Sequence, residues 1–391
     1  MRTEGDLIKI NEWLLPLSWL YGLGVRFRNW LFDVGIKKSQ AFDIPVISVG
    51  NITVGGSGKT PHVEYLVRLL KDKARVAVLS RGYKRKGKGF ILADENTTME
   101  EIGDEPFQMH RKFPDVAVAV EKKRVKGIEL LQENPATKDV EVIVLDDAFQ
   151  HRHVKPGINI LLVDYHRLFI YDKLLPAGRL REPVSGKRRA DIVIVTKCPK
   201  DLKPMEYRVL TKALDLFPYQ GLYFTTINYR APQYVFGGNE VKMEELKDHH
   251  VLLLAGIASP KHMEKDLEGK FASTRTLAFP DHHMFRRKDI ARISEAFNAL
   301  PHPRAIITTE KDAVRLRAAE GMDEEMKAHL LELPIQVDFM LEQENTFNEK
   351  IISYVRKNSR DSILVKRKDD HKPKDSHHTG NGPRTISFRD H

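Results

Sequence analysis

Cysteine is almost absent from this chain of 391 residues, which contains only Cys198. An intramolecular disulfide and a metal site built from several cysteines are therefore excluded, and the composition suits a reducing compartment. The chain also lacks a Gly-x-Ser-x-Gly sequence and a His-Glu-x-x-His sequence. Neither the nucleophile elbow of α/β-hydrolases nor the helical zinc site of metalloproteases is indicated.

A long apolar run near the N-terminus is also missing. The apolar segment 13–25 reaches only about two-thirds of a bilayer span, and Pro16, Gly22 and Gly24 interrupt it. Aromatic residues next to arginines such as Arg26 favour a segment that lies in the membrane interface. The alternative is an N-terminal helix packed on the domain core.

Positive charge is what the chain has in excess, with a formal net charge of +10. This balance favours anionic partners, which include nucleotides, nucleic acid and acidic membrane surfaces. No nucleic-acid recognition motif accompanies the charge, and part of it lies in the polar segment 357–391. We therefore expect no nucleic-acid partner, and we expect 357–391 to be a disordered basic tail.

Apolar runs alternate with helical patterns through the first half of the chain. The runs are rich in Val, Ile and Leu, which is typical of strands buried on both faces of a sheet. The strand candidates are 45–49, 75–79, 116–120, 142–145, 159–163 and 192–196. The alternation predicts an α/β fold with a mostly parallel, P-loop NTPase-like sheet wrapped by helices, followed by a second, smaller α/β domain.

A phosphate-binding loop is indicated between the first of these strands and the helix after it. The loop consists of Thr53, Val54, Gly55, Gly56, Ser57, Gly58, Lys59 and Thr60. Its second half satisfies the Walker pattern, but Thr53 occupies the place of the first glycine. We expect Lys59 to reach the β- and γ-phosphates of ATP and Thr60 to hold Mg²⁺. The alternative is a glycine-rich turn that arises by chance.

A pair of carboxylates follows another strand candidate, where 142–145 runs directly into Asp146 and Asp147. A buried strand that ends in aspartate at the carboxyl edge of the sheet is the Walker B arrangement, which predicts a Mg²⁺ site. The alternative is two solvated loop carboxylates. Together with the phosphate-binding loop, the pair predicts an ATP- and Mg²⁺-dependent kinase.

Three other polar groups are open to two interpretations. The basic segment 80–86 could hold phosphates or be a solvated loop. Asp104 precedes a helical pattern, where an aspartate is usually an N-terminal cap. His282 and His283 are too few for a zinc site without a third ligand, so a structural role is the default.

Changes in composition and in hydrophobic periodicity along the chain divide it into five expected segments. Residues 1–38 are an amphipathic membrane-interface segment, and 39–218 are the P-loop kinase domain. Residues 219–240 alternate aromatic and turn residues without a helical period, and we expect an extended linker there. Residues 241–356 are expected to form the smaller C-terminal α/β domain, before the tail at 357–391.

Several segments together resemble one family, the tetraacyldisaccharide 4′-kinases of lipid A biosynthesis. The matching segments are SVGNITVGGSGKTP, SRGYKRK, GDEP, LDDAFQHR, LPAGRLREP, VTK, AGIASP, FPDHH and TTEKDAVRL. Thr53 in place of the first Walker glycine is itself a feature of this family. Arg124 lies near a family arginine that contacts substrate or nucleotide.

The resemblance implies a bacterial enzyme that transfers the γ-phosphate of ATP to the 4′-hydroxyl of tetraacyldisaccharide 1-phosphate. It implies ATP and Mg²⁺ as cofactors and an acylated disaccharide lipid as substrate. It also implies a peripheral protein on the cytoplasmic face of the inner membrane, in contact with the inner leaflet. We expect a monomer.

The resemblance also implies a set of metal ligands. Thr60, Asp146 and Asp147 keep the roles expected from the residues themselves, and Glu182 matches a glutamate linked to the metal in the family. Ala148 replaces the glycine that usually follows the aspartate pair. That change leaves the carboxylates in place but could alter the local turn.

Catalytic roles are implied for four further residues. Arg181 is expected to face phosphate, and Lys59 to neutralise charge during transfer. Asp104 matches the proposed catalytic aspartate of the family, paired with His282 or, as an alternative, with His283. Such a pair can accept and relay the proton of a sugar hydroxyl.

One competing function is a membrane-associated P-loop ATPase that acts as a partner-binding switch. Proteins of that kind carry a signature lysine before the paired glycines, and this chain has Val54 at that place. The sequence therefore favours the kinase.

Overall fold

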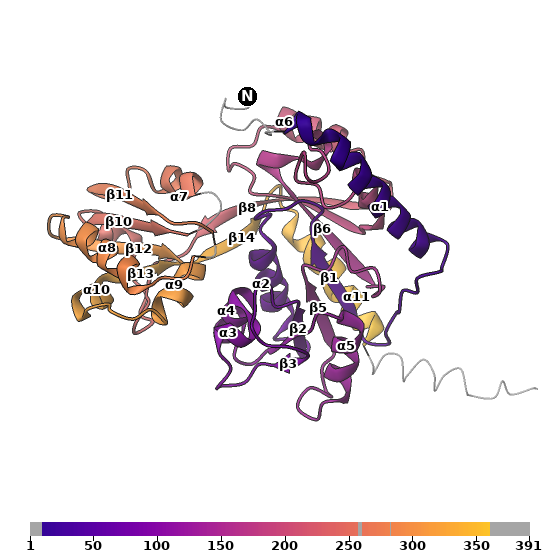
Figure 1. Cartoon of the computed structure of the whole chain (residues 1–391), viewed down its shortest axis with the longest axis horizontal. Helices are drawn as coiled ribbons and strands as arrows, with labels where there is room; N and C mark the ends of the chain where they lie inside the picture. Colours follow the sequence, from indigo (N-terminus) through magenta and orange to yellow (C-terminus); the bar gives the residue numbers. More distant parts are fainter. Residues whose placement is uncertain (1–9, 257–259, 282, 360–391) are drawn as a thin grey trace, which may run out of the picture.

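The computed structural model describes residues 10–256, 260–281 and 283–359 of the chain, arranged as a larger and a smaller lobe (Figure 1). Nearly all of the expected tail at 357–391 lies outside these residues, and so does His282. Each lobe is built around its own sheet, and two strands of the larger sheet lead to the smaller lobe.

The larger lobe contains a nine-stranded sheet with the order β14-β8-β7-β6-β1-β5-β2-β4-β3. The strands are β1 (Val46–Gly50), β2 (Val76–Ser80), β3 (Ile91–Leu92), β4 (Ala117–Val120), β5 (Val142–Asp146), β6 (Ile158–Asp164), β7 (Ile192–Thr196), β8 (Gly221–Tyr229) and β14 (Ile335–Phe339). Only β3 and β14, at the two edges, pair antiparallel with their neighbours. The predicted mostly parallel α/β sheet is confirmed.

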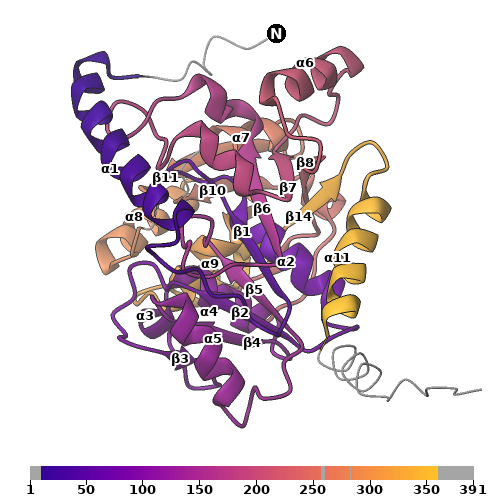
Figure 2. The same ribbon diagram turned by 90° about the vertical axis from the view of Figure 1, so that its right-hand side faces the viewer.

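Helices cover both faces of this sheet because alternate strand residues are apolar on both sides. They are α2 (Lys59–Leu70), α3 (Met99–Ile102), α4 (Asp104–Lys112), α5 (Arg124–Glu133), α6 (Pro204–Leu214) and α11 (Glu344–Asn358). Helices α2 and α11 bury Leu66 and Phe347 in one apolar cluster on one face (Figure 2). Helix α5 buries Leu131 in a separate cluster with other strand residues.

The smaller lobe is a second α/β unit, as predicted. Its five-stranded sheet has the order β11-β10-β12-β13-β9. The strands are β9 (Gln233–Tyr234), β10 (His250–Ala255), β11 (Ser273–Ala278), β12 (Arg304–Thr309) and β13 (Leu330–Leu333), and the helices are α7 (Pro260–Leu267), α8 (Arg287–Asn298), α9 (Glu310–Arg317) and α10 (Glu324–His329).

The chain path between the lobes differs from the expected one. The segment 219–240, expected as a linker, contains β8, which is a strand of the larger sheet. The segment 241–356, expected to lie wholly in the smaller domain, ends with β14 and α11, which return to the larger lobe. The return is stabilised because β14 pairs with β8 and α11 buries Phe347 and Ile351 against the larger sheet.

Helix α1 (Leu15–Asp33) lies on the larger lobe with one face packed and the other open. On the packed face, Ser18 donates a hydrogen bond of 3.0 Å to the Leu174 carbonyl, and Gly22 is buried. The open face presents large apolar side chains: Leu17, Trp19, Leu20, Leu23, Phe27 and Trp30. Over the described part of the chain, every helix is too short or too polar to cross a bilayer.

Candidate functional site

The phosphate-binding loop follows β1 and is held by pairing with the segment 179–181. The Val54 amide donates to the Arg179 carbonyl over 2.7 Å, and the Arg181 amide donates to the Ile52 carbonyl over 2.8 Å. Thr53 forms an antiparallel bridge with Leu180. A strand-like backbone accepts a side chain, which explains why glycine is not needed at Thr53.

The carbonyls of the loop are held by donors from the protein. The Gly56 carbonyl accepts a hydrogen bond from Lys197 Nζ, and the Ser57 carbonyl accepts one from Thr196 Oγ1 over 3.0 Å. His62 Nδ1 lies 2.7 Å from the Gly58 carbonyl oxygen. In a planar, trans peptide the carbonyl and the N–H group point in opposite directions. The N–H groups of Gly58 and Lys59 share their peptides with the Ser57 and Gly58 carbonyls and therefore point away from these partners. Both N–H groups lie at the start of α2, where they are suited to bind an anion.

Gly58 itself has a left-handed backbone, with φ of 80°, and Gly55 has φ of 122°. These conformations explain two of the glycines in the loop, because L-residues with a side chain rarely adopt them. Lys59 opens α2 directly after Gly58, and Pro61 falls in the first turn, where its missing amide hydrogen costs nothing. The expected strand–loop–helix context is present.

The carboxylate pair stands at the end of β5, beside the loop. Asp147 has a left-handed backbone with φ of 47°, which turns the chain sharply after the strand. Asp147 Oδ1 lies 3.6 Å from Lys59 Nζ and 3.2 Å from Arg181 Nη1. Ser80 donates a 3.2 Å hydrogen bond to Asp146 Oδ2. Strands β1, β2 and β5 therefore bring these side chains to one edge of the sheet.

The two aspartates have opposite electrostatic surroundings. Burial and the neighbouring carboxylate of Asp147 raise the pKa of Asp146 to about 6. Burial also opposes ionisation of Asp147, but Lys59 and Arg181 outweigh it and lower the pKa of that carboxyl. The pair therefore combines a firmly ionised carboxylate with one that a further cation would help to ionise.

The residues at this edge can hold a divalent cation. Asp146 Oδ1 is buried and, within the described residues, accepts no hydrogen bond. A hard oxygen donor in that state, next to a second carboxylate and the hydroxyl-bearing Thr60, suits Mg²⁺. Both carboxylate oxygens of Glu182 already have partners: Oε1 accepts a hydrogen bond from Gln150 over 3.0 Å, and Oε2 accepts one from Arg189 Nη2 over 2.7 Å.

Within the ranges that the structure describes, no group of three or more His, Cys, Asp or Glu side chains is arranged to hold a metal ion. The expected metal role of Glu182 stays a prediction.

Arg124 is buried beneath the aspartate pair. Its Nη2 donates to the Asp146 backbone carbonyl over 3.0 Å, and its Nη1 donates to the Glu121 carbonyl over 2.8 Å. Burial lowers its pKa to about 10, while Asp146 and Asp147 act in the opposite direction. Arg124 remains a cation at neutral pH and lowers the free energy that is needed to keep two adjacent carboxylates ionised.

Asp104 is the first residue of α4, and its side chain does not cap that helix. The N-cap position belongs to Gly103. The carboxylate of Asp104 instead accepts hydrogen bonds at Oδ2 from Arg315, a residue of α9 in the smaller lobe. The default interpretation as a helix cap is therefore wrong, and the residue lies where the two lobes meet.

The predicted partners of Asp104 are the two histidines. His282 lies outside the described residues. His283 Nε2 lies 3.1 Å from Asp289 Oδ2, and its ring stacks on Phe279 with centroids 4.9 Å apart. His283 is thus engaged within the smaller lobe, and the pairing of His282 with Asp104 stays a prediction.

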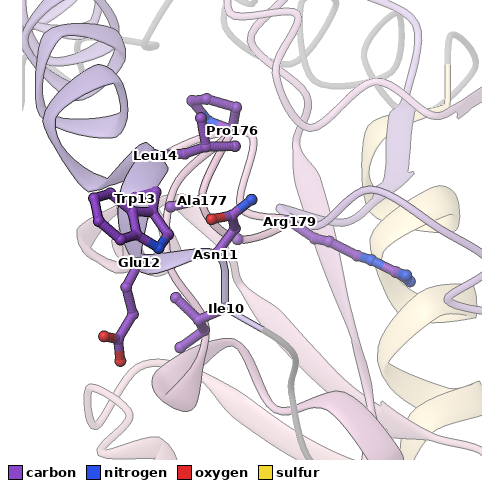
Figure 3. Close-up of a pocket in the computed structure, with 9 residues that line it drawn as sticks. Ile10, Asn11, Glu12, Trp13, Leu14, Pro176, Ala177 and Arg179 are labelled. Atoms are coloured by element: carbon purple, nitrogen blue, oxygen red, sulfur yellow. The ribbon is translucent and has the colours of Figure 1, made fainter.

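A surface hollow of about 580 Å³ is lined by the segment 10–14, which leads into α1, and by the segment 176–179. Trp13, Leu14, Pro176 and Ala177 are among the residues around it (Figure 3). The segment 176–179 is the one whose Arg179 carbonyl holds the phosphate-binding loop. The hollow therefore lies between the segment that leads into α1 and the segment that holds the phosphate-binding loop.

Sequence reasoning missed three residues of this region. Lys197 and His62 hold loop carbonyls, and Arg315 reaches Asp104. Lys197 lies in the VTK segment and has φ of 57°, a conformation that sequence alone does not reveal. The basic segment 80–86 is mixed, since Ser80 contacts Asp146 whereas Lys86 forms a surface ion pair with Glu100.

Comparison with known proteins adds an independent observation. A family model described as tetraacyldisaccharide-1-P 4′-kinase matches residues 10–356. The tetraacyldisaccharide 4′-kinase of Phocaeicola vulgatus is 59% identical over 362 residues, which cover 92% of this chain and 99% of that protein. The protein of the same name from Bacteroides fragilis is 52% identical over 378 residues, with 94% and 100% covered.

A solved structure is also similar. It is the crystal structure of an "apo" form of LpxK from Aquifex aeolicus in complex with ATP. The TM-score is 0.68 and the sequence identity 33%, over 88% of this chain and 98% of that chain.

Proposed function

Because this chain belongs to the tetraacyldisaccharide-1-P 4′-kinase family, we propose that it transfers the γ-phosphate of ATP to the 4′-hydroxyl of tetraacyldisaccharide 1-phosphate. One observation carries the proposal within the molecule itself: the start of α2, with Lys59, stands beside the Asp146–Asp147 pair at one sheet edge. A nucleotide phosphate and its cation would require this combination of donors and carboxylates.

The loop amides and Lys59 are proposed to bind the β- and γ-phosphates. The residues Thr53, Val54, Gly55, Gly56, Ser57, Gly58 and Thr60 complete the cradle. Arg181, now paired with Asp147, is 28% exposed at its side chain and could turn to a phosphate oxygen once a cation satisfies that carboxylate. Catalysis then depends on charge neutralisation and on alignment of the reacting atoms.

Mg²⁺ is proposed to bind between Thr60 and the aspartate pair, with Glu182 as a more distant contributor. Its bound charge would neutralise the phosphates and lower the pKa of Asp146. The support is the combination of the unsatisfied Asp146 Oδ1 and the raised pKa of that carboxyl. A buried oxygen without a hydrogen bond and a carboxylate that resists ionisation are both unfavourable in the protein alone. A bound cation would satisfy the oxygen and favour the ionised carboxylate.

Asp104, with His282, is proposed to accept the proton of the 4′-hydroxyl. The support from the described residues is that Asp104 is half-buried at the junction of the lobes and does not act as a helix cap. A sugar hydroxyl is a weak nucleophile at neutral pH, so a positioned base accelerates its attack.

Contact with an acidic membrane surface is proposed for the open face of α1. Six large apolar side chains face outward there, and the exposed Arg26 is next to Phe27 in the sequence. Apolar burial and attraction to anionic lipid act together in such a segment. The hollow beside Trp13 and Pro176 would then receive acyl chains of the substrate, close to the phosphate-binding loop.

The proposal is tested with purified protein, Mg²⁺, ATP labelled in its γ-phosphate and tetraacyldisaccharide 1-phosphate in detergent. Label is expected in the lipid, and Lys59→Ala is expected to reduce its transfer by at least about a thousandfold. Lys71→Ala, at the exposed end of the same helix, is the matched control. Hydrolysis of ATP without labelled lipid would favour the ATPase switch instead.

A further inference from the structure

The contact between Asp104 and Arg315 joins the two lobes at the proposed base. Arg315 Nε donates to Asp104 Oδ2 over 3.1 Å, and Nη2 donates to the same oxygen. The Arg315 side chain is completely buried, whereas that of Asp104 is 18% exposed. A buried guanidinium thus holds one oxygen of a carboxylate that solvent can still reach.

Arg315 is itself held by Asp312, one turn earlier on α9. Its Nη1 lies 3.0 Å from Asp312 Oδ1, and Asp312 is also completely buried. Asp312 Oδ2 accepts hydrogen bonds from the Gly256 amide over 2.8 Å and from Thr309 Oγ1 over 2.7 Å. A Cβ atom at Gly256 would lie only 2.8 Å from Asp312 Oδ1, so the close approach requires glycine.

A purely structural role would be to join the lobes, but other ion pairs already do so. Lys311 Nζ lies 2.6 Å from Glu105 Oε1, and Lys112 pairs with Glu310. Arg315 differs from both in its partner, because it binds the carboxylate that the proposed function makes the base.

We infer that Arg315 is a positioning residue, which the smaller lobe supplies to orient Asp104 and to keep its carboxylate ionised during phosphate transfer. This inference rests on the proposed role of Asp104 as base. Two N–H groups on Oδ2 fix the plane of the carboxylate and hence the direction of Oδ1. The guanidinium also balances the negative charge that the nearby acidic groups impose.

Two helices contribute the charged groups that the described contacts join to Asp104 and its neighbour. Helix α9 contributes Arg315, Asp312 and Lys311, and α4 contributes Glu105 beside Asp104. Glu105 also acts on Asp146 at the end of β5, whose pKa it helps to raise. Loss of Arg315 would remove the cation that pairs directly with Asp104, and Asp104 would then hold its proton up to a higher pH.

The test compares Arg315→Met, Arg315→Lys and the matched control Lys311→Met by measuring kcat and KM across pH. Arg315→Met is expected to lower kcat by about 10- to 100-fold with little change in KM for ATP. Activity is expected to fall at low pH as Asp104 is protonated, and we call this part of the pH profile of kcat/KM the acid limb. Arg315→Met is also expected to move the acid limb up by about one pH unit. Arg315→Lys keeps the charge but not the two-pronged contact, so kcat falls while the acid limb stays in place.

Lys311→Met breaks an ion pair between the same two helices, but the partner of Lys311 is Glu105 and not Asp104. It is therefore expected to change the limb and kcat much less than Arg315→Met does. An Arg315→Met protein that folds and keeps the parent kcat and acid limb overturns the inference. If that variant does not fold, an unchanged kcat in Arg315→Lys overturns it. Asp104→Asn tests the role of Asp104 as base separately from the role of Arg315 as its positioning residue. A parent-like kcat in that variant would mean that Asp104 is not the base, and the proposed function itself would be contradicted at this residue.

Discussion

The two adjacent aspartates at the end of β5 are held in opposite electrostatic states. Burial and Asp147 raise the pKa of Asp146 to about 6, above its ordinary value of 3.8. Between about pH 4 and 6 the unfolded chain has released this proton, whereas the folded protein keeps it. The free energy of unfolding therefore falls as pH rises through this window, and the cost persists at neutral pH.

Asp146→Asn is accordingly expected to stabilise the protein in the absence of metal and nucleotide. At pH 7 the free energy of unfolding should rise by about 1–3 kcal/mol, and its decrease between pH 4 and 6 should become weaker. The measurement is the thermal melting midpoint across pH. Phosphate transfer should nevertheless be lost, because a ligand of the proposed cation is gone.

Asp147→Asn is the matched comparison and has the opposite sign. Lys59 and Arg181 lower the pKa of Asp147, so its carboxylate stabilises the folded protein at neutral pH and this contribution fades as pH falls. The variant should melt below the parent at pH 7. Equal melting shifts for the two variants would contradict the electrostatic account.

Part of this site was predictable from the sequence for a physical reason. Lys59 and Asp146 follow parallel strands, and the carboxyl ends of such strands share one edge of the sheet. The contact of Arg315 with Asp104 was not predictable, because the two residues are 211 positions apart. No local periodicity encodes which helix of a second lobe docks on the first.

Among the elements, the buried strands were the most predictable. Continuous Val, Ile and Leu runs gave β1, β2 and β5 within a residue or two, because both faces of each strand are buried. Strand β14 was placed in the wrong lobe. It follows β13 with only Pro334 between them, and its membership of the larger sheet depends on antiparallel pairing with β8, about a hundred residues earlier in the chain.

Helix α1 is the element on which membrane contact depends. Leu20 and Leu23 are 65% and 59% exposed, so replacing both with Glu should leave the fold intact. It should reduce binding to vesicles that contain anionic lipid by at least about tenfold, because apolar burial is lost and negative charge is added. Sedimentation with vesicles measures this effect.

The control is Phe236→Glu, which adds one negative charge, against two in the variant of α1, at an exposed aromatic residue of the smaller lobe. It should sediment as the parent does, and both proteins should melt at the parent temperature. If the variant of α1 binds vesicles as well as the parent, the membrane contact lies elsewhere. Transfer to a water-soluble, short-chain acceptor should be unaffected in all three proteins.

Across the whole molecule, the two lobes are joined by the β8–β14 ribbon and by the contact of α4 with α9 (Figure 1). The central cation of that contact is Lys112, which lies 2.7 Å from Glu64 Oε2 and also pairs with Glu310. Glu64 is buried, and its pKa is raised by burial and by Glu310 while Lys112 opposes the rise. One lysine thus holds two carboxylates from different lobes together.

Lys112→Met should therefore destabilise the protein by about 1–3 kcal/mol, because the buried Glu64 carboxylate loses one of its two cations and keeps only Arg68, 3.0 Å away. The melting midpoint should fall by about 2 °C or more. Small-angle scattering should also report a larger radius of gyration if the lobes separate. Lys86→Met is the control, since its ion pair with Glu100 is exposed and contributes no more than about 1 kcal/mol. Equal losses in the two variants would mean that Lys112 does not hold the lobes together, and the orientation of Asp104 by the smaller lobe would then need another support.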